Sequence, residues 1–574
     1  MATIAEDIVA TLRASGVKRV YGLPGDSLNG FTDALRLDGT IEWVHVRHEE
    51  SAAFAASADA ALTNELAVCA GSCGPGNLHF INGLYDAHRS RVPVLAIAAH
   101  IPSSEIGSQY FQETNPMELF RDCSVFAEQV QVAEQMPRLL SIAMREAIER
   151  QGPAVLVIPG DIALQEGQAK EPLSIRPTHS TTTPVPSELD RAAGVLDASA
   201  KVTILAGAGC EGAHDELVAL AGHLQAPVVH ALRGKEFVEY DNPYDVGMTG
   251  LLGFSSGYHA MQDCDVLLML GTDLPYQQFY PKHAKVIQVD IRGENIGRRT
   301  PVDVALVGDV KSTAAALQAR TAQKTNSKHL DAMLKHYRKT RSKLDELATP
   351  SRGSRAIHPQ YLTRLLDEAA SDDAVFIPDV GSPVVWAARY LTMNGRRRLI
   401  GSFVHGSMAN ALPQGLGAQK AYPGRQVIAM AGDGGLTMLM GDLVSLVQNG
   451  APLKVVVYNN SSLNFVELEM KAAGFVTYGT DLANPNFAHV AESTGLLGIR
   501  VEKSKDLPAA VERFLAHDGP AVLDVVTERQ EMSMPPAVTA EQAKGFALYA
   551  IRTVMSGKGD ELVDLARANA RQIL

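Results

Sequence analysis

The sequence has few cysteines, no excess of positive charge and no long apolar run. Its 574 residues include five scattered cysteines, Cys69, Cys73, Cys123, Cys210 and Cys264. Cys69 and Cys73 form a close pair, but no second pair follows, which argues against a zinc site and favours reduced cytosolic thiols. The net charge of −12 argues against a nucleic-acid partner, because phosphate backbones are bound by clustered Lys and Arg.

The apolar runs are too short to cross a bilayer. The longest, such as residues 92–99, fall far below the roughly 20 residues that span a membrane. Residues 1–20 place acids early and contain no long apolar core, so we expect an amphipathic helix there and no signal peptide. Any membrane contact is therefore expected to be peripheral.

The chain length predicts about three or four domains. Residues 1–180 alternate helical and strand patterns, as in a doubly wound parallel sheet, and a Ser/Thr/Pro-rich linker at 178–186 ends this unit. Residues 181–340 and 341–530 show the same alternation, whereas 531–574 differ in character. We predict three doubly wound parallel-sheet α/β domains and an amphipathic helical C-terminal tail.

The stretch 427–465 carries the most specific motif. Val427–Ala431 predicts a strand, Gly432-Asp433-Gly434-Gly435 a tight turn, Leu436–Gln448 a helix and Leu453–Tyr458 a second strand. Such a βαβ unit has parallel strands and a right-handed crossover. It therefore brings Asp433 and Asn459-Asn460 together at the carboxyl edge of one sheet.

A carboxylate and an amide oxygen at a glycine-rich helix start suit Mg²⁺ with diphosphate oxygens among its ligands. The alternative is an ordinary α/β turn with a solvated Asp433, and GDG alone favours that alternative. GDG followed by NN, with Asn460 at 460 − 433 = 27 positions after Asp433, is much more specific.

Glu49 follows the predicted strand 41–46, before an alanine-rich helix. Ligands bind at such strand ends in parallel sheets, and a carboxylate there suits proton exchange with a heterocyclic nitrogen. The alternative is a charge that compensates the helix dipole, a role that Glu50 fits better. The next strand, 66–70, runs into a glycine loop at 71–77 that is expected to pass close to a ligand.

The middle domain repeats glycine turns at strand ends. Gly207-Ala208-Gly209-Cys210-Glu211-Gly212 matches G-x-G-x-x-G after a strand, a pattern with many false positives. Further turns lie at Arg233-Gly234-Lys235, Gly250-Leu251-Leu252-Gly253, Gly271-Thr272-Asp273 and Asp290-Ile291. Several such turns along one sheet edge suit an extended dinucleotide, and turns without any ligand are the alternative.

The tail has helical periodicity. The segment 543–555 places its apolar residues broadly on one face, namely Phe546, Ala547, Ala550, Ile551, Val554 and Met555. The segment 561–574 adds Leu562, Leu565, Ala566 and Ile573. A mildly basic amphipathic helix on an acidic protein is typical of membrane surfaces. A helix packed on its own core is an equally weighted alternative.

Together, GDGG, NN, RHEE, GSCGPGN and HGSMAN make the chain resemble the thiamine diphosphate-dependent decarboxylases of the pyruvate oxidase and acetohydroxyacid synthase group. Within that group it is most similar to the bacterial pyruvate:quinone oxidoreductases, or quinone-dependent pyruvate dehydrogenases. The resemblance runs through all three domains and into the tail, in AVCAGSCGPGNLHFINGL, IPSSEIGSQYFQET, HALRGKE, EYDNPYDVGMTGLLGFSSG and EQAKGF.

The resemblance implies a thiamine diphosphate site. Glu49 would activate the aminopyrimidine, while Asp433, Asn460 and the backbone of Ser462 would hold Mg²⁺. Further cofactor contacts would come from Gly406, Ser407, Met408 (the apolar wedge between the two rings), Gly434 and Gly435. The substrate pocket would be lined by Phe111 and Gln112, with Phe465, Val466 and Glu469 on the loop facing the intermediate.

The resemblance also implies FAD in the middle domain. Its contacts would be Leu232, Arg233, Gly234, Lys235, Gly250, Leu251, Leu252, Gly253, Gly271, Thr272, Asp273, Asp290 and Ile291. The tail would be the lipid-activated, membrane-binding segment. One departure is Asn464, where such enzymes commonly have Gly; Asn is the next most tolerant residue for left-handed backbone geometry.

The implied activity is oxidative decarboxylation of pyruvate to acetate and CO₂, with electrons passing through FAD to a membrane quinone such as ubiquinone. The expected location is the cytoplasm, peripheral on the cytoplasmic face of the inner cell membrane. Each thiamine site would lie between domain one of one subunit and domain three of another, so a homodimer is the minimum and a homotetramer is expected. The alternatives are an acetohydroxyacid synthase-like carboligase with structural FAD, an oxygen-using pyruvate oxidase that forms acetyl phosphate, and a non-enzymatic cofactor-binding scaffold.

Overall fold

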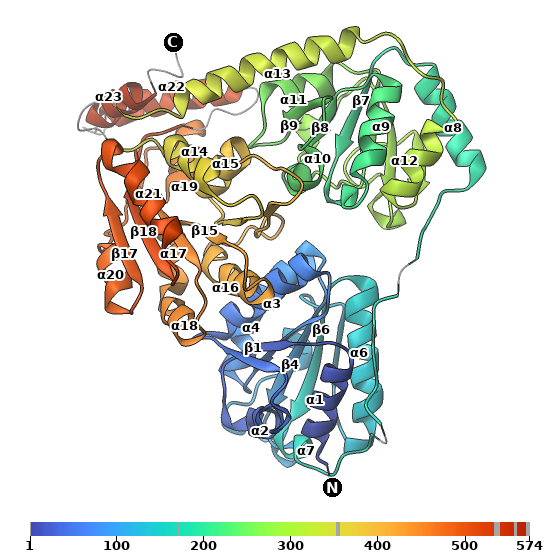
Figure 1. Cartoon of the computed structure of the whole chain (residues 1–574), viewed down its shortest axis with the longest axis vertical. Helices are drawn as coiled ribbons and strands as arrows, with labels where there is room; N and C mark the ends of the chain where they lie inside the picture. Colours follow the sequence, from blue (N-terminus) through green and yellow to red (C-terminus); the bar gives the residue numbers. More distant parts are fainter. Residues whose placement is uncertain are drawn as a thin grey trace.

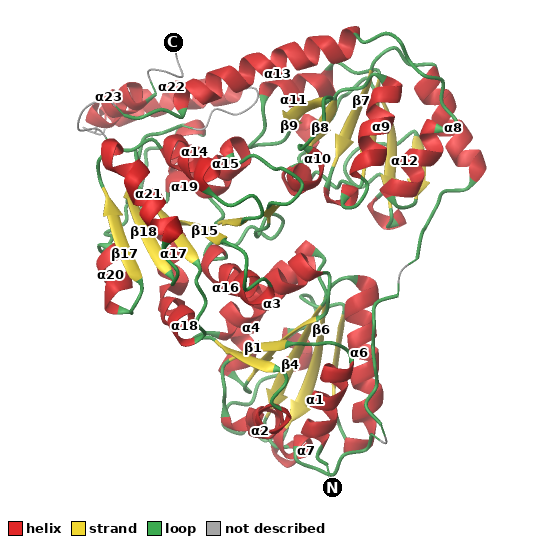
Figure 2. Ribbon diagram, viewed as in Figure 1, coloured by secondary structure: helices red, strands yellow, loops and turns green. Residues whose placement is uncertain are grey.

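A computed structural model describes residues 2–169, 171–178, 180–351, 356–532, 540–555 and 559–569. Three six-stranded sheets follow one another along these residues, and every strand pair in them is parallel. Helices cover both faces of the sheets (Figures 1 and 2). This architecture confirms the predicted fold class.

Domain one has the strand order β2-β1-β3-β4-β6-β5. Its strands are β1 Arg19–Gly22, β2 Glu42–His45, β3 Ala67–Gly71, β4 Val94–His100, β5 Phe126–Gln129 and β6 Pro153–Pro159. Its helices are α1 Ile4–Ala14, α2 Asn29–Asp38, α3 Glu49–Thr63, α4 Pro75–Ser90, α5 Pro116–Leu119, α6 Met136–Arg150 and α7 Gly160–Ala163. The glycine loop after β3 leads directly into α4.

The middle domain has the order β12-β11-β10-β7-β8-β9. Its strands are β7 Val202–Ala206, β8 Val228–His230, β9 Asp245–Met248, β10 Val266–Leu270, β11 Lys285–Asp290 and β12 Val304–Val307. Its helices are α8 Pro186–Asp197, α9 His214–Leu224, α10 Lys235–Val238, α11 Ser255–Gln262, α12 Val310–Gln318 and α13 Lys328–Leu347.

Domain three has the order β14-β13-β15-β16-β18-β17, which repeats the topology of domain one. Its strands are β13 Val375–Pro378, β14 Arg398–Leu399, β15 Val427–Gly432, β16 Lys454–Asn459, β17 Leu497–Val501 and β18 Ala521–Val526. Its helices are α14 Pro359–Ala369, α15 Ser382–Tyr390, α16 Ala411–Ala421, α17 Asp433–Leu439, α18 Leu443–Gln448, α19 Asn464–Ala472, α20 Phe487–Ser493 and α21 Leu507–Ala516. The helix predicted over 436–448 is thus two helices with a 3₁₀ turn at Met440–Asp442 between them. The turn predicted at 432–435 is wrong, because β15 continues to Gly432 and α17 begins at Asp433.

Domains one and three of the same chain pack together through α3 and α16 (Figure 1). The helices approach so closely that a Cβ added to Gly417 would lie 2.1 Å from the carbonyl oxygen of Ala55. Small residues at the crossing permit this separation. Apolar residues of both domains therefore form one continuous core.

Arginines fasten the middle domain to its neighbours by donating to backbone carbonyls. Arg233 Nη2 donates to Ser90 O (2.9 Å), and Arg292 Nη2 donates to Arg150 O (2.6 Å), both in domain one. From domain three, Arg389 Nε donates to Leu252 O (3.1 Å). These three bonds hold the carboxyl edge of the middle sheet against the other two domains.

The tail forms α22 Ala540–Met555 and α23 Gly559–Ala568 beside α19. Tyr549 is fully buried with the Lys471 ammonium 5.5 Å from its ring centre, and Arg552 Nη1 donates to Gly474 O (2.5 Å). The predicted apolar face points mostly outward, because Ile551 and Met555 are 58% and 81% exposed. Residues 533–539, 556–558 and 570–574 of the predicted tail, Ile573 among them, lie outside the described residues.

None of the helices in the described ranges combines the length and apolar character needed to cross a bilayer.

Candidate active site

Asp433 sits where β15 passes directly into α17. It is buried, its Oδ1 accepts from its neighbour Gly434 N (2.8 Å), and its Oδ2 accepts from Asn460 N (3.0 Å) and Ser461 N (2.6 Å). The register of β15 and β16, with Gly432 opposite Tyr458, brings these residues to one sheet edge. Burial raises the pKa of Asp433, and the surrounding N–H donors oppose that rise.

The loop after β16 places the other predicted metal ligands beside Asp433. Asn460 Oδ1 accepts from Ser462 N (3.0 Å), and Ser461 takes the left-handed backbone, with φ of 57°. The described residues contain no cluster of three or more His, Cys, Asp and Glu side chains able to hold a metal ion. A cation here would thus depend on one carboxylate, amide and backbone oxygens, and oxygens of a bound ligand, which is the donor set of Mg²⁺.

Gly434 and Gly435 open the first turn of α17 and leave no room for side chains. A Cβ at Gly434 would lie 2.7 Å from Leu463 Cδ2 and 3.4 Å from Met408 Cε, so Met408 reaches over this turn. Gly406 has φ of 81° and open space where a Cβ would be, and Ser407 follows it. Bare backbone at a helix start is where a diphosphate can approach closely, so these residues fit thiamine diphosphate and Mg²⁺.

Asp379 is a buried carboxylate beneath this turn, at the end of β13. A Cβ at Gly435 would lie 1.7 Å from Asp379 Oδ2, and the nearby backbone N–H groups, such as those of Ala411 and Gly432, do not meet either carboxylate oxygen with full hydrogen-bond geometry. Burial raises the pKa of Asp379 to about 7, although the N–H groups of nearby backbone lower it in part. The predicted Asp379-Val380-Gly381 turn gave no indication of this environment.

Glu49 is the first residue of α3 and is buried. Its Oε2 lies 2.8 Å from His79 Nδ1, and the His79 ring stacks on His48 with 4.1 Å between ring centres. Its Oε1 faces Gly76, where an added Cβ would be 3.0 Å away. Glu49 therefore has one oxygen engaged and one turned toward the glycine loop.

The predicted substrate-pocket residues lie beside the same loop. Gln112, with φ of 62°, lies against Gly74, and its Oε1 accepts from Cys73 Sγ (3.3 Å). Phe111 is 78% exposed. The structure thus joins Gln112 to the Glu49 loop and leaves the Phe111 ring at the surface of the single chain.

Asn82 links the Glu49 region to the cofactor loop of domain three. Its Nδ2 donates to Glu50 Oε1 (2.7 Å) and Ser407 Oγ (2.9 Å), and its Oδ1 lies 2.7 Å from His405 Nε2. Domain one and the Gly406–Met408 segment of the same chain therefore meet at this amide.

The helix α19 carries the predicted loop residues. Phe465 packs against the core of domain three, and Val466 is 44% exposed. Burial raises the pKa of Tyr276 in the middle domain, and the charge of Glu469 adds to that rise. Asn464 does not use a left-handed backbone. Its amide instead accepts from Ser382 Oγ (2.9 Å) and donates to Arg529 O (2.6 Å) at the helix start.

The glycine turns of the middle domain follow β7, β8, β9, β10 or β11 and so share one sheet edge. Gly271, with φ of 56°, lies against Gly209 of the G-x-G-x-x-G segment. Thr272 and Asp290 are buried, and Asp273 is bound by Arg299 Nε (2.8 Å). Among the remaining predicted contacts, Lys235 is buried and pairs with Glu239. Gly234, Gly250 and Gly253 are also buried, Leu252 is half-buried, and Leu251 and Ile291 are exposed.

Arginines gather at this edge. Burial and the positive charge of Arg91 both lower the pKa of Arg233 and of Arg292. Neighbouring positive charges of this kind suit the diphosphate of a dinucleotide. Arg91 and Arg292 were not predicted from sequence, although Arg292 directly follows Ile291.

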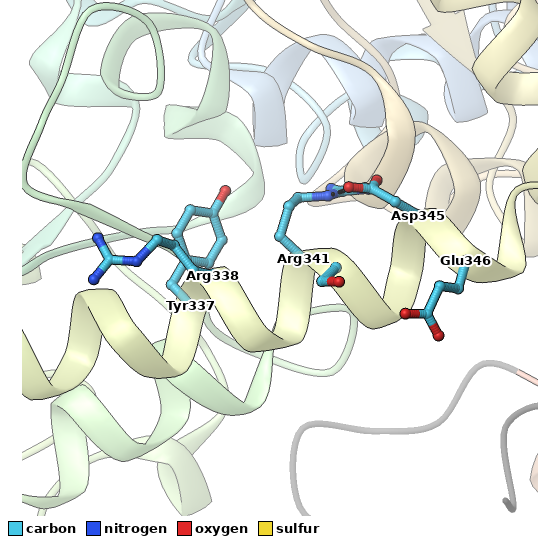
Figure 3. Close-up of a pocket in the computed structure, with 6 residues that line it drawn as sticks. Tyr337, Arg338, Arg341, Asp345 and Glu346 are labelled. Carbon is cyan, nitrogen blue, oxygen red and sulfur yellow. Dashed lines mark hydrogen bonds and ion pairs between the residues drawn. The ribbon is translucent and has the colours of Figure 1, made fainter.

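A surface hollow of about 520 Å³ lies along α13, apart from these residues (Figure 3). It is lined by Tyr337, Arg338, Arg341, Ser342, Asp345 and Glu346. Arg341 Nη2 donates to Asp345 Oδ1 (2.9 Å) across its floor, so this charged pair is internally satisfied. The hollow shares no residue with the predicted site.

Family models match the three domains in order. The N-terminal TPP binding domain of thiamine pyrophosphate enzymes matches residues 2–119, the central domain matches 189–317 and the C-terminal TPP binding domain matches 379–525. Thiamine pyrophosphate is thiamine diphosphate under its other name. The two outer matches contain Glu49 and Asp433.

Several relatives match over most of the chain, three of which follow. A Bacillus subtilis protein described as thiamine pyrophosphate-containing is 36% identical over 99% of both chains. A pyruvate oxidase of Lactiplantibacillus plantarum is 30% identical over 90% of this chain and 87% of its own. The large subunit of acetolactate synthase isozyme 2 of Escherichia coli is 31% identical over 92% of this chain and 96% of its own.

Proposed function

The chain belongs to the thiamine pyrophosphate enzymes, and from that premise we propose that it oxidises pyruvate to acetate and CO₂ and passes the electrons through FAD to a membrane quinone. The overall reaction balances as pyruvate + H₂O + quinone → acetate + CO₂ + quinol. Thiamine diphosphate, when bound, supplies a nucleophilic carbon and retains the electron pair that remains as CO₂ leaves, and FAD accepts that pair.

The observation that carries the proposal is the packing of the predicted flavin turns against domain three. Leu232 and Leu252 of those turns lie against the domain-three core, as does Phe465 of α19, and Arg389 Nε of domain three donates to Leu252 O (3.1 Å). The turns predicted to bind FAD and the helix that follows the predicted metal loop thus share one core. A short path between the two cofactors is needed for oxidation and not for carboligation.

Within this proposal Glu49 holds a proton at the aminopyrimidine and so governs the basicity of the cofactor. Its free Oε1 is available for that contact, while His79 holds Oε2. Asp433, Asn460 and the backbone of Ser462 would hold Mg²⁺, and Met408, which reaches over the Gly434 turn, would be the apolar wedge against the cofactor rings. Gln112 and Phe111 border the pyruvate pocket, which Phe465 and Val466 close from the α19 side.

The middle domain binds FAD along its arginine-lined edge. Arg233 is already held by Ser90 O, and its remaining N–H donors suit a phosphate. The outward apolar stripe of α22, which includes Ile551, Val554 and Met555, is proposed to contact phospholipid. We further propose a location on the cytoplasmic membrane face and a homo-oligomer, a tetramer built from dimers.

A carboligase of the acetohydroxyacid synthase type is the second candidate, and the 31% identity to the Escherichia coli acetolactate synthase subunit favours it. In that case FAD would be structural. An oxygen-using pyruvate oxidase that forms acetyl phosphate is a third, related to the Lactiplantibacillus plantarum match.

An anaerobic titration separates these functions. Protein supplied with thiamine diphosphate, Mg²⁺ and FAD is mixed with pyruvate while the oxidised-flavin absorbance is followed, and a soluble quinone is then added with and without phospholipid vesicles. Bleaching by pyruvate and recovery with quinone, faster with lipid, support the proposal. A flavin that stays oxidised while CO₂ and acetolactate form would overturn it in favour of the carboligase. If air is then admitted in place of quinone, reoxidation of the flavin by oxygen, with acetyl phosphate formed from added phosphate, would favour the third candidate.

A further inference from the structure

Asn484 lies outside every sequence motif, yet its side chain reaches Asp433, 51 positions earlier in the chain. It follows α19 and precedes α20. Its Nδ2 donates to Asp433 Oδ2 (2.8 Å) and also to Asn459 Oδ1 (2.9 Å). Both amide hydrogens of Asn484 therefore have acceptors on the two strand ends that form the predicted cation site.

The two carboxylate oxygens of Asp433 accept different numbers of hydrogen bonds. Oδ2 accepts three, from Asn460 N, Ser461 N and Asn484 Nδ2, whereas Oδ1 accepts one, from Gly434 N. A carboxylate offers about two lone-pair sites on each oxygen. Oδ2 is thus fully occupied, and Oδ1 retains a free site for a cation.

Asn484 is itself held in place from two sides. Leu482 N donates to Ser461 O (3.0 Å), and Leu463 N donates to Thr480 O (2.8 Å), which pairs this segment with the loop after β16. On the far side, Asn459 Nδ2 donates to the fully buried Asp524 (2.9 Å), which Arg500 Nη1 contacts at 2.5 Å. The contact to Asp433 is therefore part of an anchored chain of hydrogen bonds.

We propose that Asn484 is a positioning residue that orients the Asp433 carboxylate so that Oδ1 faces the divalent cation. The inference rests on the proposed function, since it takes Asp433 as a cation ligand. Groups that orient a metal ligand from behind typically contribute about 10–100-fold to metal affinity. Asn484 does not touch the substrate or the cofactor in this role.

The test measures cation affinity without turnover. Full-length, cofactor-depleted wild type, N484A and D433N are titrated with Mn²⁺ in the presence of thiamine diphosphate, and free Mn²⁺ is followed by electron paramagnetic resonance. We expect N484A to raise the Mn²⁺ Kd by about 10–100-fold. An unchanged Kd in folded N484A would overturn the inference.

The matched control is N486A. Asn486 lies two residues further along and caps α20 by accepting from His489 N (3.2 Å). We expect this variant to lower the thermal midpoint and leave the Mn²⁺ Kd unchanged. An equal weakening of Mn²⁺ binding in N486A would indicate a general effect of the segment and overturn the specific role of Asn484.

Two further variants keep the test decisive. If N484A does not fold, N459L removes the other anchor of the Asn484 amide, and we expect a raised Kd there too; an unchanged Kd would count against the inference. D433N distinguishes an error in the proposed cation site from an error in the role of Asn484. If D433N binds Mn²⁺ as wild type does, the proposed cation site itself is wrong, whereas loss in D433N with normal binding in N484A refutes only the positioning role.

Discussion

Replacing Asp379 by Asn should change how stability depends on pH. Asp379 is 1% exposed, and the nearby backbone N–H groups offset only part of the effect of burial, so folding places a carboxylate where ionisation is unfavourable. Burial raises its pKa from 3.8 to about 7. At about 1.4 kcal/mol per pKa unit, this difference corresponds to about 4 kcal/mol once the group is ionised.

The direction follows from linkage. Because the folded pKa is raised, the favourable contribution of Asp379 is complete below pH 3.8 and is lost as pH rises through about 7. The amide of D379N does not titrate. The unfolding free energy of D379N minus that of wild type should therefore increase by about 2–3 kcal/mol between about pH 5 and pH 8.

Trp386 provides a local probe. The chain has two tryptophans, Trp43 in domain one and Trp386 in α15, next to β13 in the domain-three core. In a W43F background, urea unfolding of the cofactor-free protein followed by Trp386 fluorescence reports domain three at each pH. If the unfolding free energies of D379N and its W43F parent changed with pH in the same way, the reasoning would be refuted, because Asp379 would then be ionised or solvated in the folded state.

Three further changes test other contacts. E49Q should reduce turnover at least about 10²–10⁴-fold with flavin content unchanged, and full activity would reject Glu49 as the activating acid. G417A places a Cβ against the Ala55 carbonyl of α3 and should lower the free energy of unfolding in urea by about 1–3 kcal/mol. The control G424A adds a Cβ in open space and should leave that free energy unchanged; equal effects of the two changes would contradict the close crossing of α3 and α16. K471M removes one of the two cations that contact the buried Glu467, Arg529 being the other, and should cost about 3 kcal/mol in urea unfolding. The double variant E467L/K471M should recover part of that loss but not all, because Arg529 and Ser462 then lose their contact with Glu467; additive losses would show that Glu467 and Lys471 are not coupled.

Local sequence patterns were enough to predict the three sheets and the elements at their edges. Val427–Ala431 and Leu453–Tyr458 were predicted as strands within one residue of β15 and β16. The glycines at 434 and 435, predicted as part of a turn, instead form the first turn of α17 directly after β15. The position of Asp433 beside Asn460 then required only that parallel strands end at the same edge.

Features that depend on contacts between residues far apart in the sequence could not be predicted from local patterns. The break at Met440–Asp442 interrupts a regular helical pattern because Asp442 turns to domain one, where its Oδ1 accepts from Arg47 N (2.7 Å). Asn484 reaches Asp433 from a segment with no motif. The predicted apolar face of the tail was correct as a face, but Gly545 and Tyr549 on the opposite side make the contact with domain three.

The arginines that fasten the middle domain donate to carbonyl oxygens of Ser90, Arg150 and Leu252. A backbone carbonyl is present whatever side chain its residue carries, so the accepting positions are free to diverge during evolution. The donors Arg233, Arg292 and Arg389 have no such freedom, since only a long forked side chain supplies those N–H groups. We therefore expect sequence changes at this domain border to accumulate at the accepting positions and not at the three arginines. Relatives could keep the same domain arrangement after most of the accepting residues have been exchanged.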